Sequence, residues 1–127
     1  MNFFAATVES MAGGLSFQAE TFAFPVPADW QQALAGHQGR KVVFGIRPED
    51  LGSPKAEETP GQPKITATVE VIEPMGSETY LYLKTGATSF IARVDAHRKC
   101  EVGHQLALSV LLSEAHVFDQ ETEAILA

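Results

Sequence analysis

Residues 40–52 have the sequence RKVVFGIRPEDLG, in which a strand pattern runs directly into a turn pattern. From Val42 to Ile46 every second residue is large and apolar, and this period of two predicts a strand with one buried face. Pro48 suits the first position of a helical turn, and the acidic residues after it favour the positive end of the helix dipole. The stretch therefore predicts a strand followed by a single helical turn that ends at Gly52.

Short strands with the same period precede this stretch. Gly13-Gly14 predicts a hairpin turn between two of them, and Pro25 ends the pairing of a third. A helix of about two turns is expected between Asp29 and Gly36, because Asp29 and Gln32 have the spacing of a capping box. Such a short helix needs to dock on the sheet to be stable. The buried face of the strands is expected to hold Phe4, Ala6, Val8, Leu15, Phe17, Phe22 and Phe24.

Four further strands are expected in the C-terminal half. Apolar residues alternate or cluster with strand spacing over residues 65–71, 80–83, 90–94 and 106–112. Between the two halves, residues 53–63 (SPKAEETPGQP) contain three prolines, a glycine and charges of both signs. This composition predicts an exposed, flexible loop.

The pattern as a whole predicts a single domain over residues 1–127. Its short strands are regularly spaced and are not separated by helices, which favours antiparallel pairing over a parallel sheet with crossover helices. We therefore expect a mainly β fold, a small barrel or sandwich of short antiparallel strands with one short helix. After Phe118, a short terminal helix capped by Asp119 or Thr122 is also expected.

The composition limits the functions that this chain can have. Its 127 residues include 16 acidic and nine basic side chains, for a net charge of -7 at pH 7. A negative chain repels phosphate backbones, so nucleic-acid binding is disfavoured. No apolar run approaches the about 20 residues that a membrane helix needs, and the single cysteine, Cys100, fits a reducing compartment. The motifs of phosphate loops, zinc proteases and serine hydrolases do not occur, so no catalytic constellation is predicted.

Five segments follow one another in an order that resembles a known family. They are residues 1–4 (MNFF), 45–51 (GIRPEDL), 69–78 (VEVIEPMGSE), 102–108 (VGHQLAL) and 116–122 (HVFDQET). Together they resemble the C-terminal regulatory region of the ATP-binding subunits of carbohydrate-uptake ABC transporters, of the maltose and glycerol-phosphate type. That region is known as the TOBE domain. The resemblance covers nearly the whole chain and implies an OB-like fold.

The same resemblance implies that the chain works as part of a larger subunit. A nucleotide-binding domain would precede it and would bind ATP and Mg²⁺, so the chain itself would hold no cofactor, no metal and no catalytic residue. The domain would form a homodimer with a second copy and contact the nucleotide-binding domain of its own polypeptide. Through that domain it would act on permease subunits at the cytoplasmic face of the inner membrane. The candidate interface residues are Gly45, Arg47, Pro48, Glu49, Gly76, Glu78, Phe118 and Asp119.

Two other kinds of site are weighed against the residues and disfavoured. His97, Cys100 and His104 have a spacing that suits soft metal ligands, but three ligands without a second cluster favour a solvated loop. Tyr80 and Tyr82 lie on one face of a predicted strand, as in a stacking platform for single-stranded nucleic acid. Such platforms lie in basic grooves, whereas this chain is acidic, so we expect no nucleic-acid partner.

An oxyanion- or metabolite-binding sensor module is the alternative function. Residues 89–93 (SFIAR) resemble the oxyanion-binding strand of molybdate-binding relatives of the same fold. Phe90 and Ile91 occupy the middle of this segment, where compact polar residues would be wanted. The net negative charge of the chain also opposes the capture of an anion. We therefore place the regulatory and dimerisation role first and the sensor role second.

Overall fold

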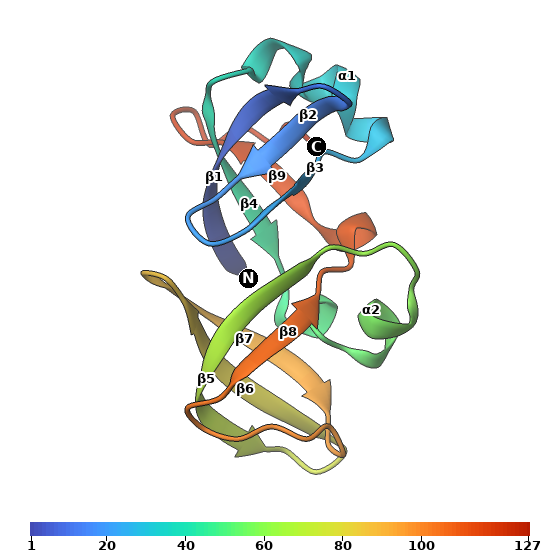
Figure 1. The fold of residues 1–127 in the computed structure, drawn as a ribbon, viewed down its shortest axis with the longest axis vertical. Helices are drawn as coiled ribbons and strands as arrows, with labels where there is room; N and C mark the ends of the chain where they lie inside the picture. The colour runs from blue at the N-terminus through green and yellow to red at the C-terminus, as the bar shows by residue number, and fades with distance from the viewer.

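Two antiparallel sheets form two lobes, and both ends of the chain belong to the same one (Figure 1). The computed structural model describes residues 1–127. The upper lobe in Figure 1 has the strand order β3-β2-β1-β4-β9, and the lower lobe has the order β7-β6-β5-β8. The chain passes to the lower lobe after β4 and returns at its end, so that β9 pairs with β4. The mainly β fold of short antiparallel strands predicted from the sequence is confirmed.

The elements have the following bounds. The strands are β1 (Asn2–Met11), β2 (Gly14–Gln18), β3 (Ala23–Pro25), β4 (Lys41–Ile46), β5 (Lys64–Pro74), β6 (Glu78–Thr85), β7 (Thr88–Asp95), β8 (Gln105–Ser109) and β9 (His116–Asp119). The α-helices are α1 (Gln31–Leu34) and α2 (Pro54–Glu58). The 3-10 turns are η1 (Ala28–Trp30), η2 (Ala35–His37), η3 (Pro48–Asp50) and η4 (Leu112–Glu114). The helical turn predicted after Arg47 is η3.

Aromatic rings fill the centre of the upper lobe. Phe44 lies on β4, between β1 and β9, and its ring centroid lies 6.0 Å from that of Phe17 and 5.5 Å from that of Phe24. All three rings are at least 95% buried. The Phe24 and Phe44 rings meet edge to face, a geometry that adds about 0.5–1.5 kcal/mol to the burial of such a pair. The period of two predicted this buried face, and the structure confirms it except at Phe22, which precedes β3 and is only partly buried.

Polar and aromatic contacts join the two lobes. The side chain of Asn2 donates from Nδ2 to the carbonyl of Ile91 at 2.6 Å and accepts from the Ile91 N–H at Oδ1 at 3.0 Å. Asn2 thus pairs with β7 as a strand would. Beside it, the rings of Phe4 and Phe90 lie 5.2 Å apart in an edge-to-face arrangement. These contacts place the buried residues of both lobes in one continuous cluster.

Helix α1 forms near the predicted position but not by the predicted capping. The helical segment begins with η1 after Pro27, and neither η1 nor α1 has a side-chain cap. The predicted capping box of Asp29 and Gln32 is therefore wrong, because the helical turn has its N-cap at Pro27, two residues before Asp29. Gln31 instead docks the helix on the sheet: its Oε1 accepts from the Leu15 N–H at 3.0 Å, and its Nε2 donates to the Val26 carbonyl at 2.8 Å.

Helix α2 occupies residues that were expected to be irregular. Within the predicted loop at 53–63, Pro54 takes the first helical position and the Ser53 hydroxyl accepts from the Ala56 N–H at 3.4 Å. The side chain of Ala56 is fully buried. The loop interpretation was wrong for residues 54–58, since proline and serine there serve as helix-starting residues rather than as helix breakers.

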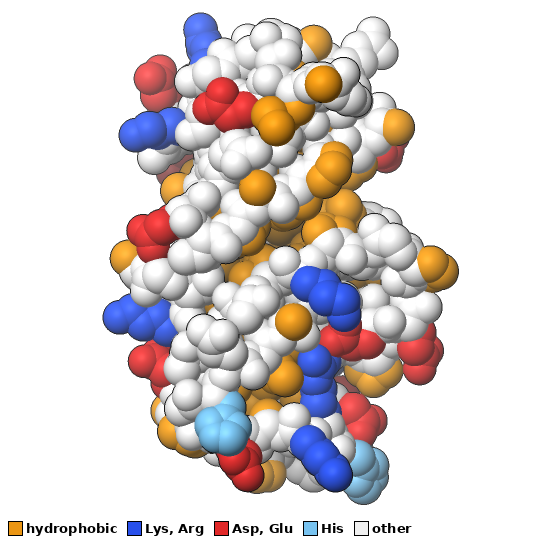
Figure 2. All heavy atoms as spheres, in the orientation of Figure 1, with side chains coloured by type: hydrophobic (Ala, Val, Ile, Leu, Met, Phe, Trp, Pro, Cys, Tyr) orange, Lys and Arg blue, Asp and Glu red, His pale blue; other side chains and the backbone are white.

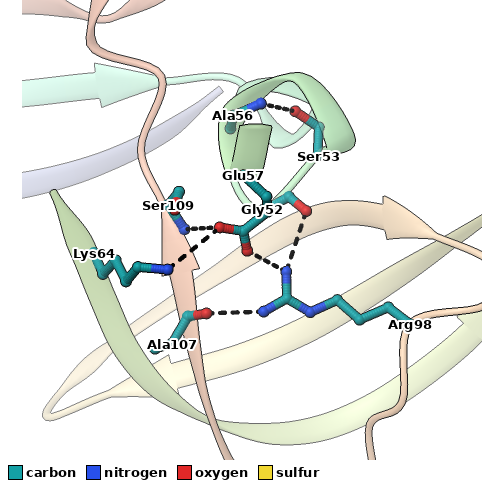
Figure 3. A network of polar contacts seen from close by, with 8 residues as sticks. All are labelled: Gly52, Ser53, Ala56, Glu57, Lys64, Arg98, Ala107 and Ser109. Carbon is teal, nitrogen blue, oxygen red and sulfur yellow. Dashed lines mark hydrogen bonds and ion pairs between the residues drawn. The ribbon is translucent and has the colours of Figure 1, made fainter. Parts of the chain in front are cut away.

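A network of charged hydrogen bonds fastens α2 to β8 (Figure 3). Arg98 donates to the Glu57 carboxylate, to the Ala107 carbonyl at 2.9 Å and to the Gly52 carbonyl at 3.4 Å. Glu57 also accepts from the Ser109 N–H at 3.3 Å. Less than a quarter of either charged side chain is exposed. The network therefore replaces water around two largely buried charges.

The Glu57 carboxyl has a pKa below its ordinary value of 4.5. Burial opposes its ionisation, but the hydrogen bonds from Ser109 and Arg98, with the positive charges of Arg98 and Lys64, outweigh that effect. A pKa lowered by folding means that the ionised carboxylate stabilises the fold above the unfolded pKa. This stabilisation is lost as the pH falls through the lower, folded pKa.

We predict that the Glu57 network makes the domain sensitive to acid. In urea unfolding between pH 7 and pH 3, the unfolding free energy of the unaltered domain should fall below about pH 4.5. Glu57→Gln should lower the stability at pH 7 and flatten this decline. The exposed neighbour supplies a matched control, because Glu58→Gln should keep the full decline. An equally steep decline in Glu57→Gln would contradict the prediction.

The C-terminal tail folds back on β9 instead of forming a helix. The Val117 N–H donates to the Ala127 carbonyl at 2.8 Å, and Phe118 forms a bridge with Ile125. Between them the chain turns, and Glu123 has a φ of 62°, which is incompatible with a right-handed helix. The predicted terminal helix was wrong because backbone pairing with β9 satisfies the tail's polar groups.

The surface has mixed character. On the face drawn in Figure 2, charged side chains of both signs are scattered over the lobes, and apolar atoms gather in a hollow at the waist between them. None of the helices has the length and apolar character that crossing a lipid bilayer requires.

Candidate functional site

The structure divides the predicted interface residues between two surfaces. Glu49 and Glu78, which are 29 positions apart, line one groove together. Gly45 and Phe118 lie on the outer side of the upper sheet, where β9 pairs with β4. Asp119 lies at the edge of that side. The eight candidates therefore do not form one site.

The first surface, which we call the polar groove, is an open hollow of about 440 Å³. Arg93 on β7 lies in it, and its Nε is 2.7 Å from Oε2 of Glu78 on β6. Lys55 at the start of α2 supplies a second cation. The groove is lined by Glu49, Ser53, Pro54, Lys55, Ser77, Glu78, Arg93, Val94 and Asp95. With three acids against two cations, one of them already paired, the groove does not present a free cationic centre.

The remaining candidates near the groove shape the backbone. Arg47 is exposed and precedes η3 without capping it, and Pro48 occupies the first position of η3. Gly76 is exposed in the turn between β5 and β6 and has a φ of +91°, a conformation that glycine adopts without strain. Pro48 and Gly76 thus belong to the two turns next to Glu49 and Glu78, which both line the polar groove.

The second surface, which we call the apolar outer face, covers the solvent side of β1, β4 and β9. Strand register places Phe3 opposite Gly45 and Ala5 opposite Val43, and Val43 in turn lies opposite Phe118. The Phe3 side chain is 57% exposed. The face comprises Met1, Phe3, Ala5, Val43, Gly45 and Phe118. A solvent-facing side of an antiparallel sheet is ordinarily polar, so this face departs from the usual alternation.

Gly45 is required by the packing of this face. A Cβ at Gly45 would lie 2.9 Å from Met1 Sδ, 3.1 Å from Phe118 Cε2 and 3.4 Å from Phe3 Cε1. The two rings meet nearly edge to face over the glycine, with centroids 6.3 Å apart. Because Gly45 has no side chain, Phe3 of β1 and Phe118 of β9 can lie next to each other over β4. A hollow of about 360 Å³ adjoins them, lined by Phe3, Val43, Phe118, Asp119, Gln120 and Glu123.

Asp119 stabilises the turn after β9. Its Oδ1 accepts hydrogen bonds from the N–H groups of Glu121 at 2.8 Å and Thr122 at 3.0 Å. These hydrogen bonds, led by the one from Thr122, lower the pKa of the Asp119 carboxyl. Nε2 of His37 lies 3.7 Å from the other carboxylate oxygen. The carboxylate therefore shapes the edge of the apolar outer face.

The segments weighed for other functions have different surroundings. The N–H and the carbonyl of Ile91 both form hydrogen bonds with the side chain of Asn2, and Phe90 is buried in the core. No group of three potential ligand side chains is placed to hold a metal ion. His104 pairs with Glu101 at 3.3 Å instead.

Sequence reasoning missed several residues of both surfaces. Arg93 and Lys55 line the polar groove, although the sequence suggested Arg93 only as part of the segment 89–93 and Lys55 only as part of a loop. Val43 on the apolar outer face lies between Val42 and Phe44, which the period of two predicts to be buried, and no role was predicted for it. Phe3 and Val43 are apolar residues at outward positions of two neighbouring strands, β1 and β4. Apolar residues at such positions are a signal by which an apolar outer surface could be predicted from sequence.

Two family models match the chain. The MalK OB fold domain matches residues 1–51, and the TOBE domain matches residues 44–118. The matches meet in β4 and η3, the stretch that joins the lobes.

Among curated proteins, similar sequences occur in ATP-binding proteins of transporters. The multiple sugar-binding transport ATP-binding protein MsmK of Streptococcus mutans is 46% identical over 90 residues, 70% of this chain and 24% of that protein. The oligosaccharides import ATP-binding protein MsmX of Bacillus subtilis is 34% identical over 126 residues, 97% of this chain and 33% of that protein. The trehalose/maltose import ATP-binding protein MalK of Thermococcus litoralis is 33% identical over 89 residues, 68% of this chain and 24% of that protein.

One solved structure has a similar fold. The cytoplasmic molybdate-binding protein ModG superposes with a TM-score of 0.66, covering 91% of this chain and 94% of that one, at 17% identity. This likeness shows the fold alone. Our chain spans a quarter to a third of the length of the three relatives. It belongs to the TOBE domain family, and it corresponds to the OB-fold and TOBE region of the ATP-binding subunits of sugar ABC importers.

Proposed function

We propose that the chain is the regulatory and dimerisation domain of the ATP-binding subunit of an ABC importer for sugars or related solutes, and that it is not catalytic by itself. The observation that carries this proposal is the pair of family matches, which extend without a gap from residue 1 to residue 118. The proteins with similar sequences are ATP-binding proteins of sugar transport. The outer face of the upper sheet, which is apolar where solvent exposure would favour polar side chains, supports a role in association.

This role implies particular partners. The chain would pair with a second copy of itself and contact the nucleotide-binding domain of its own polypeptide. ATP and Mg²⁺ would bind that other domain, and this chain would bind neither. The permease subunits would be indirect partners at the cytoplasmic face of the inner membrane, and nucleic acid would not be a partner.

Sedimentation equilibrium of the isolated chain tests the dimerisation role. We expect a species of twice the 13.7 kDa monomer mass at micromolar to high micromolar concentrations. A monomer over that whole range would overturn the role. Calorimetric titration with Mg-ATP should give no saturable heat, and a saturable isotherm would contradict the proposal that this chain binds no ATP.

An oxyanion- or metabolite-sensing role is the second candidate. The likeness of the fold to ModG favours it, but the unpaired cation density that an oxyanion needs is lacking in the polar groove. Titrations with molybdate, tungstate, sulfate and maltose separate the two roles. We expect flat traces, whereas a saturable isotherm of about one ligand per chain would put the sensor role first.

A further inference from the structure

Strand β8 is the outer strand of the lower sheet, and its free edge is closed by other groups than a strand (Figure 3). β8 pairs with β5 on one side, and the sheet order β7-β6-β5-β8 places no strand on its other side. Along that free edge the Ser109 N–H donates to Glu57, and the Ala107 carbonyl accepts from Arg98. The Gly52 N–H donates to the Ser109 carbonyl at 2.9 Å. These groups make the hydrogen bonds that a neighbouring strand would make.

The segment that carries Glu57 is anchored at both of its ends. We call residues 53–61 the strap. Its start is held by the hydrogen bond from Gly52 to β8. At its end, Oε1 of Gln62 accepts from the Leu112 N–H at 2.8 Å. Both anchors lie outside the strap, so they can stay in place whether or not the strap itself rests on the sheet.

Between these anchors, few contacts hold the strap on the sheet. Its helix α2 has five residues, and a helix this short is not stable without tertiary contacts. Ala56 is the one buried residue of the helix, and Glu57 forms the ion pair with Arg98. Lys64 lies 3.7 Å from the same carboxylate but is 58% exposed, so its pair contributes little. The closed position of the strap therefore depends on one buried methyl group and one largely buried carboxylate.

The strap also forms part of the polar groove. Ser53, Pro54 and Lys55 belong to the strap and line the groove, whose other lining residues come from η3, β7 and the start of β6. Movement of the strap away from β8 removes these three residues from the groove. A partner that binds the groove through them binds only the closed form, and it therefore stabilises that form.

We infer that the strap opens as a unit while both sheets stay folded, and that its opening frees the edge of β8 and removes one side of the polar groove. The Glu57–Arg98 pair favours the closed form, because opening separates two largely buried opposite charges. In the open form the Ser109 N–H and the Ala107 carbonyl lose these partners. An unpaired strand edge can pair with the backbone of another chain, and the closed strap prevents such pairing.

Amide hydrogen exchange of the unaltered chain, measured in water and in urea below the unfolding transition, tests whether the strap opens by itself. The N–H groups of Glu57 and Thr59 donate within the strap and its flanking residue, and that of Ser109 donates to Glu57. We expect these three amides to exchange at rates that urea hardly changes, because a local opening exposes little surface. The amides of β1 and β4 should accelerate steeply with urea. An equal urea dependence of both groups would overturn the inference, since the strap would then open only when the chain unfolds.

A pair of neighbouring substitutions tests the role of the ion pair. Glu57→Ala should speed the exchange of the Thr59 and Ser109 amides about tenfold or more, because it removes the carboxylate that holds the strap. Glu58→Ala is the matched control, since Glu58 is exposed on the same helix, and it should leave both rates unchanged. Unchanged rates in a folded Glu57→Ala variant would overturn the inference. If that variant does not fold, the urea dependence of the unaltered chain still decides the question.

Discussion

Phe44→Ala is expected to lower the unfolding free energy by about 3–5 kcal/mol, the usual cost of removing a buried aromatic ring. Phe44 is 1% exposed, and its ring touches those of Phe17 and Phe24 on two other strands. Alanine leaves a cavity beside β4, between β1 and β9, that surrounding residues fill only partly. Urea unfolding followed by far-UV circular dichroism measures the change.

A conservative variant separates cavity formation from other causes. Phe44→Leu keeps most of the volume and should cost roughly 1–2 kcal/mol. An alanine variant that loses less than about 1 kcal/mol would show that β4 is not central to the core, contrary to the packing described above.

Arg98→Met is expected to cost on the order of 3 kcal/mol, the second of the large effects. The substitution removes the guanidinium that donates to Glu57, Gly52 and Ala107. It leaves Glu57 as a largely buried carboxylate with Lys64 as its remaining cation. Because Glu57 lies on α2, the helix that borders the polar groove should also become less protected against amide hydrogen exchange.

Arg93 provides the control for Arg98. Its pair with Glu78 is about a third to a half exposed, so Arg93→Met should destabilise the fold much less than Arg98→Met does. Arg98→Lys keeps the charge but lacks the planar fork that reaches three acceptors, and it should recover only part of the loss. Equal effects of the methionine substitutions at positions 93 and 98 would show that burial of the network contributes nothing.

Much of the strand pattern could be predicted from local signals. The period of two at Val42, Phe44 and Ile46 indicates β4, and glycine pairs and prolines indicate its neighbours, because these residues act on the backbone within a few positions. Helix α2 was missed because Ser53 and Pro54 serve both as loop residues and as helix-starting residues. The packing of Ala56 and the contact of Glu57 with Arg98, 41 positions away, decided between the two.

The candidate residues could be found from ordered motifs, but their grouping could not. Glu49 and Glu78 line one groove only because β6 pairs with β7 and β7 packs against η3. Gly45 meets Phe118 only because β9 returns to pair with β4 after the whole lower lobe has been built. Neither pairing has a local signal, since the energy that favours it comes from burying residues far apart in the chain.

The order of residues alone thus specifies the strands, most turns and the family, because each depends on side chains and backbone angles of near neighbours. The folded molecule adds what depends on long-range pairing, namely the polar groove and the apolar outer face. The alternation of β4 shows that Val43 points away from the core. That this outward side joins rings from β1 and β9 into one surface follows from the sheet order β1-β4-β9, which no short stretch of sequence encodes.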